Sequence, residues 1–338
     1  MKLTVVVVVF DMPREAPRTL LSLSTSYQRG IPTEDYEVLV VDSGSRPPFD
    51  ARELDSLEGN FRLICLENPT VTPVTAVNRG LAEARGDLIC VMIDGARIAT
   101  PGLLAAALRA DSAHPGAVIT PLGWYLGFDM QADLVRRGHG PTEEDALLAR
   151  IEWPSDGYRL FEIGVLDESN QHWQTRGEVT ESNALFLRRD AWKHLDGMDR
   201  RFTSSAGGLV SLDTFSRAVE AANRKVVLLL GEGTFHQVHG GFATNSVDDQ
   251  RRLRMREMYR EYARIRGKKY AAASFEPICH GSVPLVGAEI LGTAARLREE
   301  RDMLARELTR IRASPLHRLS APLRGATAWI RSLQRTAG

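Results

Sequence analysis

The sequence predicts an α/β fold in which helices flank a mostly parallel central sheet, followed by a C-terminal helical and coiled-coil tail. Short apolar runs of strand length alternate with helical segments over the first 93 residues, as in consecutive βαβ units. The runs Leu3 to Phe10 and Leu88 to Ile93 are apolar almost throughout, as expected for strands that are covered on both faces. Near the C-terminus, leucine and isoleucine recur at heptad spacing.

Length and composition are those of a globular protein with a substantial core. A chain of 338 residues with 43% apolar residues accommodates one large domain with an appendage, or two domains. Lysine plus arginine and aspartate plus glutamate number 43 each, which gives no electrostatic case for nucleic-acid binding. The cysteines Cys65, Cys90 and Cys279 form neither a metal-binding spacing nor a disulfide framework, which fits the cytoplasm.

The N-terminal run Leu3 to Phe10 is too short to cross a bilayer and no cleavage site follows it. We therefore interpret it as a buried strand and expect no transmembrane helix. No glycine motif of the dinucleotide-binding or P-loop type is present. The further expected elements are a helix around residues 18–27, strands at Tyr36–Val41, Phe61–Leu66, Leu88–Ile93, Ser182–Phe186 and Val226–Leu230, and a helix around Arg189–Leu195.

Three expected strands end in an aspartate, namely Asp11, Asp42 and Asp94. The carboxyl ends of parallel strands meet at one edge of a sheet, where α/β proteins bind their ligands. We therefore expect these carboxylates to converge. An aspartate that only caps its own turn has the same appearance in sequence, and this alternative stays open.

Four segments, in this order and spacing, resemble the family 2 glycosyltransferases with the GT-A fold: VVVVVF, EVLVVDSGS, AVNRGLAEARGDLICVMIDGARIATPG and ESNALFLRRDAWKHLDGMDRRF. The resemblance implies a Rossmann-like GT-A domain, which we assign to residues 1–245. It also implies an inverting enzyme of cell-surface polysaccharide synthesis, which moves a sugar from a nucleoside-diphosphate sugar to a glycan or lipid-linked acceptor. The alternative is a non-catalytic nucleotide- or glycan-binding module on a degenerate GT-A fold.

The resemblance places Asp42 on the nucleoside and Asp94 in the DxD motif, which holds Mg²⁺ or Mn²⁺ against the diphosphate. Here Ala96 replaces the last carboxylate of that motif and Arg97 follows, so either a metal ion or the guanidinium could meet the diphosphate charge. Two histidines after the last expected strand could complete a metal site or neutralise phosphate. The candidate donor-binding residues are Asp11, Asp42, Asn78, Asp94 and Arg97, and the candidate metal ligands are Asp94, His236 and His239.

The resemblance also implies a catalytic base, which the family supplies from a Glu-Asp pair at the start of a helix. The corresponding sequence here is AGGLVSLDTFSRAVEAA. Alignment on Arg217 places Ser211 at the base position, whereas alignment on the carboxylate places Asp213 there. Chemistry favours Asp213, since serine is no base at neutral pH without a partner. The alternative role for Asp213 is that of a charge at a helix start.

The chain after residue 245 is expected to be helical. Residues 246–286 hold a highly charged helix, which Leu253, Met258 and Tyr262 would pack on the domain. Residues 287–338 hold about three heptads and then a basic amphipathic stretch with no acidic residue after Glu307. This tail is typical of peripheral contact with the inner face of a membrane, or of a homodimer. A helix packed on the catalytic domain is the alternative.

Overall fold

In this computed structural model, residues 1–170, 179, 182–239 and 248–282 are described, together with the single positions 303, 307 and 310. The chain divides into two compact units, residues 1–287 and 288–338. The fold below is that of the first unit. The predicted heptads and basic tail lie outside the described residues, apart from the three single positions, which are helical. The predicted domain boundaries stay predictions.

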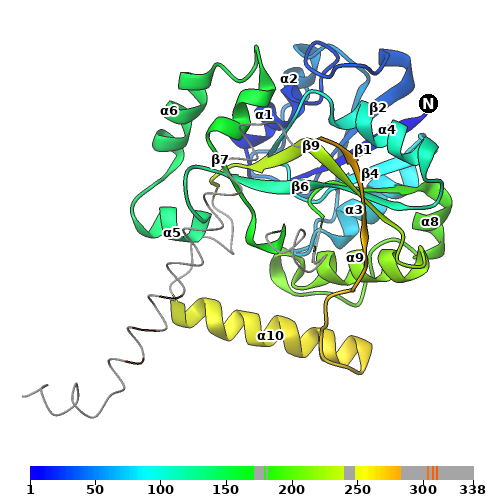
Figure 1. Cartoon of the computed structure of the whole chain (residues 1–338), viewed down its shortest axis with the longest axis vertical. Helices are drawn as coiled ribbons and strands as arrows, with labels where there is room; N and C mark the ends of the chain where they lie inside the picture. The colour runs from blue at the N-terminus through cyan, green and yellow to red at the C-terminus, as the bar shows by residue number, and fades with distance from the viewer. Residues whose placement is uncertain are drawn as a thin grey trace, which may run out of the picture. The chain divides into compact units, whose positions relative to one another are not determined.

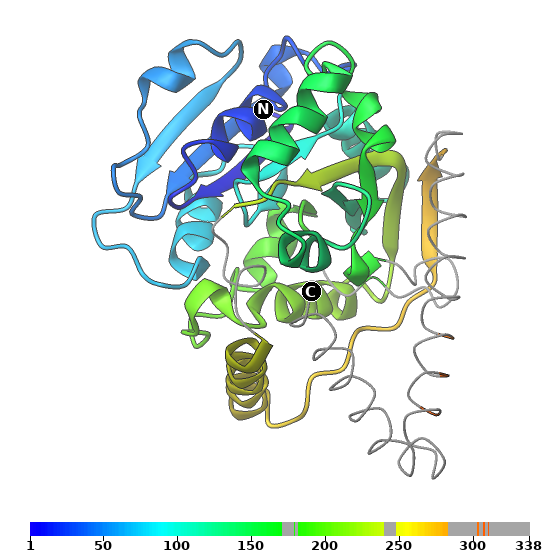
Figure 2. The same ribbon diagram turned by 90° about the vertical axis from the view of Figure 1, so that its left-hand side faces the viewer.

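A ten-stranded sheet forms the centre of the first unit (Figure 1). Its strand order is β10-β9-β6-β8-β4-β1-β2-β3, with β5 paired to β9 and β7 paired to β6. Figure 2 shows β3 and β10 at opposite edges of this sheet. The strands are β1 Leu3–Val9, β2 Tyr36–Asp42, β3 Phe61–Cys65, β4 Leu88–Met92, β5 Arg97–Ala99, β6 Val118–Leu126, β7 Gly164–Leu166, β8 Leu185–Arg188, β9 Val226–His236 and β10 Pro277–Gly281.

The sheet is mostly parallel, as the sequence predicts. Parallel pairs join β3 to β2, β2 to β1, β1 to β4, β6 to β9 and β9 to β10, whereas β5, β7 and β8 run antiparallel to their neighbours. Every residue of β1, β2 and β4 is buried, which explains why these strands are mostly apolar in sequence. The fold is α/β and of the GT-A type.

Helices cover both faces of the sheet (Figure 1). The helix α3 packs on β1 and β2, α8 packs on β8, and α4 packs on β6 and β9. The described α-helices are α1 Glu15–Leu21, α2 Arg52–Asp55, α3 Val74–Glu83, α4 Leu103–Ala113, α5 Gln131–Arg136, α6 Pro141–Ile151, α8 Arg189–His194, α9 Val210–Ala221 and α10 Asp248–Arg266. Within the described residues, none of the helices combines the length and the apolar character needed to cross a bilayer.

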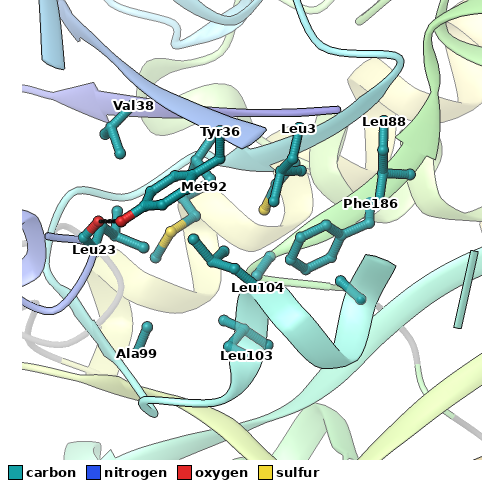
Figure 3. Close-up of a cluster of buried hydrophobic side chains, with 14 of the residues drawn as sticks. Leu3, Leu23, Tyr36, Val38, Leu88, Met92, Ala99, Leu103, Leu104 and Phe186 are labelled. Atoms are coloured by element: carbon teal, nitrogen blue, oxygen red, sulfur yellow. Dashed lines mark hydrogen bonds between the residues drawn. The ribbon is translucent and has the colours of Figure 1, made fainter. Parts of the chain in front are cut away.

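A hydrophobic core cluster lies between α4 and one face of the sheet. Alternate residues of the strands, including Leu3, Val38 and Leu88, meet Leu103 and Leu104 of α4 (Figure 3). Each of these side chains is almost fully buried, which stabilises the fold by about 1.5–3 kcal/mol per side chain. This packing fixes β1, β2 and β4 as a rigid support for the loops at their carboxyl ends.

Several predicted boundaries are wrong. The first helix spans Glu15–Leu21 rather than residues 18–27, because the hydroxyls of Ser22 and Ser24 donate to backbone carbonyls and favour turns there. The strand β9 does not end at Leu230 but continues through His236, where it pairs with β5. The strand β8 begins at Leu185 instead of Ser182.

The charged helix α10 is present, and Tyr262 is buried as predicted. Leu253 is 59% exposed, however, so it does not pack on the domain as the sequence analysis expected. Packing here depends on the C-terminal half of the helix.

Candidate active site

The three predicted strand-end carboxylates do meet at one edge of the sheet. In the parallel register, Val9 of β1 lies opposite Asp42 of β2, and Val7 lies opposite Met92 of β4. The three neighbouring strands therefore end at the same level, with Asp11 and Asp94 just beyond β1 and β4. The three strand ends thus lie at one edge of the sheet, and the three side chains there have different partners.

Asp42 holds the loop that follows β2. Its side chain is buried, and Oδ1 accepts hydrogen bonds from the backbone N–H groups of Gly44 at 3.1 Å and Ser45 at 2.9 Å. Its Oδ2 accepts the N–H of Phe49 at 2.9 Å. These contacts are those of a turn aspartate. Contact with a nucleoside would have to use the remaining lone pairs of the two oxygens.

Asp11 binds the same loop from the end of β1. Its Oδ1 accepts the backbone N–H of Arg46 at 2.7 Å, and its own N–H donates to Ser45 Oγ at 3.0 Å. Asp11 has a positive φ of 49°, a conformation that aspartate tolerates better than most residues. The pair of loops after β1 and β2 is thus tied together beside Asp42.

Asn78 lies on α3 and contacts the turn after α8. Its Nδ2 donates to the carbonyl of Met198 at 2.8 Å, and its Oδ1 accepts the N–H of Met198 at 2.8 Å. Both amide atoms thus bind the protein backbone. The structure places this predicted donor-binding residue in a contact between α3 and the turn after α8.

Asp94, His236 and His239 form a compact group, which together with Arg97 we call the Asp94 cluster. The Oδ2 atom of Asp94 lies 2.9 Å from His236 Nε2 and 3.7 Å from His239 Nε2. The two Nε2 atoms are 3.1 Å apart. Asp94 Oδ1 accepts the backbone N–H of Ala96 at 3.0 Å, so Ala96 contributes its backbone where the family motif has a carboxylate.

The path of the chain after β4 explains this grouping. Beyond Asp94 the chain turns and forms β5, in which Arg97 is the antiparallel register partner of His236 on β9. Gly95 permits the turn, because a Cβ atom at this position would lie 2.8 Å from the carbonyl oxygen of Val8. The Asp-Gly pair of the sequence therefore brings the end of β4 against β1 and β9 at once.

Two helices hold the histidines in place. Gln131 of α5 presents Oε1 to His236 Nδ1, which directs Nε2 of that ring toward Asp94. Glu144 of α6 is fully buried and accepts the backbone N–H of Val238 at 2.7 Å. Arg14 donates both to Glu144 Oε1 at 2.7 Å and to the carbonyl of Val238 at 2.8 Å.

Sequence reasoning missed Gln131, Glu144 and Arg14. Their contacts join positions about 100 or more residues apart, for example Arg14 to Glu144 across 130 residues. No local pattern marks such partners.

Burial and charge set the protonation of the cluster. Burial opposes ionisation of Asp94, but the two imidazoles outweigh it and hold the pKa of Asp94 well below its usual range. Burial lowers the pKa of His236, and the nearby Arg97 lowers it further. Burial also opposes protonation of His239, but its interaction with Asp94 outweighs this and raises the pKa of His239. The cluster thus contains an anion that draws one positive charge toward it.

The geometry of the three ligand atoms fits one divalent metal ion. They form a triangle with sides of 2.9, 3.1 and 3.7 Å. The circle through its corners has a radius of about 1.9 Å, shorter than the bonds of about 2.1 Å that divalent ions form with nitrogen and oxygen. One ion could therefore contact all three atoms and keep its other positions open.

Arg97 brings a buried charge without a full set of partners. Its side chain is 7% exposed, and within the described part of the chain Nε and Nη1 have no hydrogen-bond acceptor. Its Nε lies 3.8 Å from Asp94 Oδ2, which is too far for a hydrogen bond. Buried donors usually have partners, so these two point to an anion that binds beside Asp94.

Asp213, the predicted base, is buried between α9 and α10. Its Oδ2 accepts from Arg217 Nε at 2.9 Å and from Arg266 Nη2 at 2.6 Å, and its Oδ1 accepts from Arg266 Nε at 2.6 Å. Arg266 also pairs with Asp199 at 2.9 Å. These contacts attach α10 to the domain and favour the structural role that the sequence left open. The catalytic role of Asp213 stays a prediction.

Part of the chain matches a known protein family. Residues 4–129 match the family model described as Glycosyl transferase family 2. No curated protein matches the chain. Among solved structures, S. aureus TarS 1-349 in complex with UDP-GlcNAc is 16% identical, with a TM-score of 0.48 over 78% of this chain and 67% of that one.

A second similar structure is the mannosyltransferase PcManGT from Pyrobaculum calidifontis in complex with GDP-Man and Mn²⁺. It is 16% identical, with a TM-score of 0.47 over 99% of this chain and 82% of that one. The family match itself includes Asp42, Asp94 and Arg97 and ends just after β6. The match of residues 4–129 to the model of glycosyl transferase family 2 identifies the chain as a glycosyltransferase.

Proposed function

We propose that the chain transfers a glycosyl group from a nucleoside-diphosphate sugar to a hydroxyl group of a glycan or lipid-linked acceptor, with inversion. The observation that carries this proposal is the Asp94 cluster, in which a metal-fitting triad lies beside a buried, partly unpartnered arginine. A departing diphosphate carries concentrated negative charge, and its release is favoured by positive groups held in place before the reaction. The cluster supplies such groups at the edge of the sheet where ligands bind in α/β folds.

Asp94, His236 and His239 would hold the metal ion, and we propose Mn²⁺ rather than Mg²⁺. Two of the three ligands are imidazoles, whereas Mg²⁺ prefers oxygen ligands. When bound, the ion would supply Lewis-acid charge to the phosphate oxygens. Asp94 stays ionised because of its low pKa, and Gln131 keeps His236 turned toward the ion.

Arg97 would bind the diphosphate directly. A guanidinium stays charged at any physiological pH and donates in a fork that suits phosphate oxygens. Two donor atoms of Arg97, Nε and Nη1, have no acceptor within the described part of the chain. Asp42 and Asp11 would shape the nucleoside side of the site through the loop 43–49 that they hold.

The acceptor assignment and the cellular role rest on sequence. The basic residues interleaved with leucine and Trp329 after Glu307 favour a cytoplasmic protein that contacts the inner face of a membrane, or dimerises, through its tail. A lipid-linked acceptor in cell-surface polysaccharide synthesis would suit such a location.

Titration of the full chain with UDP, GDP, CDP, TDP and ADP, each with and without Mn²⁺, tests the donor side. We expect one or two nucleotides to bind, and Mn²⁺ to tighten their binding. The matching sugar nucleotides are then incubated with octyl glycosides, and release of the diphosphate is measured. Nucleotide binding without turnover on any acceptor would favour the non-catalytic module, and no nucleotide binding at all would refute the proposed function.

A further inference from the structure

A second polar group lies on the sheet beside the Asp94 cluster, formed by Gly123, Asp167 and Asn183, and we call it the Gly123 site. Asn183 precedes β8 and is 8% exposed, yet its Nδ2 has no hydrogen-bond partner in the described part of the chain. Buried amide donors without partners are rare in folded proteins. Asn183 Nδ2 lies beside the backbone of Gly123 in β6. If Gly123 carried a Cβ atom, that atom would lie 3.2 Å from Asn183 Nδ2.

Asp167 approaches the same point from the end of β7. The same Cβ position would be 3.7 Å from Asp167 Oδ2. The other oxygen, Oδ1, accepts the N–H and the Oγ–H of Ser169, both at 2.9 Å, and the Asp167 N–H donates to the Gly123 carbonyl at 2.9 Å. The carboxylate is thus held with Oδ2 toward Gly123. A donor and an acceptor meet where β6 has no side chain.

The Gly123 site and the Asp94 cluster share one face of the sheet. Gly123 lies two residues before Tyr125, whose register partner on β9 is His236, and alternation along a strand puts such residues on the same face. The rings of Tyr125 and His236 are 6.0 Å apart. One such step along a strand measures about 7 Å, so the Gly123 site lies next to the position proposed for the diphosphate.

A hydroxyl group is the ligand that satisfies both sides of this site. Its oxygen accepts one hydrogen bond while its proton is donated in another. Asn183 Nδ2 would donate to the oxygen, and Asp167 Oδ2 would accept the proton. Asp213 offers no comparable oxygen, because two arginines bind its buried carboxylate.

We propose that the Gly123 site binds the acceptor hydroxyl and that Asp167 is the base of the transfer, an inference that rests on the proposed function. The hydroxyl proton passes to Asp167 Oδ2, and the hydroxyl oxygen forms the new bond to the anomeric carbon. The bond from that carbon to the diphosphate oxygen breaks, and its electron pair leaves with the nucleoside diphosphate. Asn183 orients the attacking oxygen.

The test compares Asp167→Asn, Asn183→Ala and Gly123→Ala with the wild type in the full chain, using octyl glycosides as acceptors. Asparagine can keep the Oδ1 contact with Ser169 but cannot take a proton, so we expect kcat to fall by roughly 10²- to 10⁴-fold with unchanged nucleotide affinity. Asn183→Ala and Gly123→Ala should raise the KM for the glycoside, since the first removes the donor and the second crowds it. Unfolding curves for each variant establish that it is folded.

Asp35→Asn, which changes only the ion pair with Lys2 at the amino-terminal edge of the sheet, is the matched control and should keep the turnover of the wild type. Asp213→Asn is measured beside it, and its turnover is corrected for the folded fraction. Wild-type turnover by Asp167→Asn, or a loss by Asp213→Asn alone, would overturn the inference. Saturation-transfer NMR measures glycoside binding in the presence of nucleotide, and this measurement does not need turnover. The inference would also be overturned if glycoside binding were unchanged in both Asn183→Ala and Gly123→Ala, or if the wild type bound no glycoside. Failure of the wild type to bind any nucleotide would instead refute the proposed function.

Discussion

Arg97 and His236 are register partners across the antiparallel pair of β5 and β9. This relationship sets an imidazole beside a guanidinium that never loses its charge, and it helps to lower the pKa of His236. A neutral His236 presents a lone pair to a metal ion and not a proton. The same pairing brings Arg97 within 3.8 Å of Asp94, so groups for the cation and for the anion lie side by side.

Loss of a cluster ligand should abolish metal binding. We expect His236→Gln and Asp94→Asn to show no Mn²⁺ binding in titrations that follow free Mn²⁺ by electron paramagnetic resonance. Gln131→Leu, which removes only the partner of His236 Nδ1, should weaken binding by roughly 10- to 100-fold. His114→Gln, at the end of α4, is the control and should bind as the wild type does. Equal binding by all four variants would place the metal elsewhere.

Metal binding should strengthen with pH. The pKa of His239 is raised by Asp94, so the protonated form stabilises the metal-free fold at low pH, and this stabilisation is lost as pH rises through that pKa. A metal ion needs the deprotonated ring. The increase in Tm caused by Mn²⁺ should therefore be larger at pH 8 than at pH 6. In His239→Gln the increase should be smaller and less dependent on pH; the same pH dependence in this variant would contradict the assignment.

Arg97→Gln should weaken binding of the preferred nucleoside diphosphate. Hydrogen bonds to charged groups are worth about 1.5–3 kcal/mol, which corresponds to roughly a 10- to 100-fold rise in Kd by calorimetry. The variant should also unfold at a denaturant concentration no lower than the wild type, because it removes a buried charge that lacks partners. Arg97→Lys keeps the positive charge but lacks the forked guanidinium, so its Kd should lie between those of the wild type and Arg97→Gln. An unchanged Kd in Arg97→Gln would show that the anion binds elsewhere.

Asp213→Asn should act on stability. Removing one partner of a buried ion pair costs about 3–5 kcal/mol, and we expect the lower end because Arg217 and Arg266 keep some contact with solvent. Urea denaturation measures this loss. In the double variant Asp213→Asn, Arg266→Gln the two losses should not add, since they break the same contact. A catalytic role would instead appear as lost turnover at unchanged stability.

The C-terminal tail can be tested by truncation after Ile290. Basic residues near an anionic bilayer contribute about 1 kcal/mol each, so the six arginines after Glu307 should give measurable binding to anionic vesicles. We expect the full chain to sediment with such vesicles at low salt and the truncated chain to stay in solution while it still binds nucleotide. Equal sedimentation of both chains would leave the tail with a role in packing or dimerisation.

Much of the fold follows from local sequence. The strands β1, β2 and β4 were predicted to within a residue, because a strand that is covered on both faces is apolar at most positions. The β9 prediction failed, since GEGTFH has the glycines of a turn. Those residues continue as a strand only because β5 and β6 supply partners on both sides.

The candidate site was predictable only in part. Asp94, His236 and His239 could be named from the ends of expected strands, and the structure brings them together. Asp213 was predicted from the family resemblance and Asn78 was a candidate donor-binding residue, yet Asn78 binds the backbone of Met198 and Asp213 binds Arg266, 53 residues away. Their roles depend on partners that no local pattern reveals.

The order of apolar and polar residues along the chain is enough to predict which segments are buried and which edge of the sheet carries polar groups. Tertiary structure alone decided which polar groups are already paired. A hydrogen bond or ion pair requires atoms within about 3–4 Å, and that proximity is set by how distant strands and helices pack. In the described part of the folded chain, Arg97 and Asn183 have donor atoms without acceptors. Asp213, in contrast, is paired with two arginines.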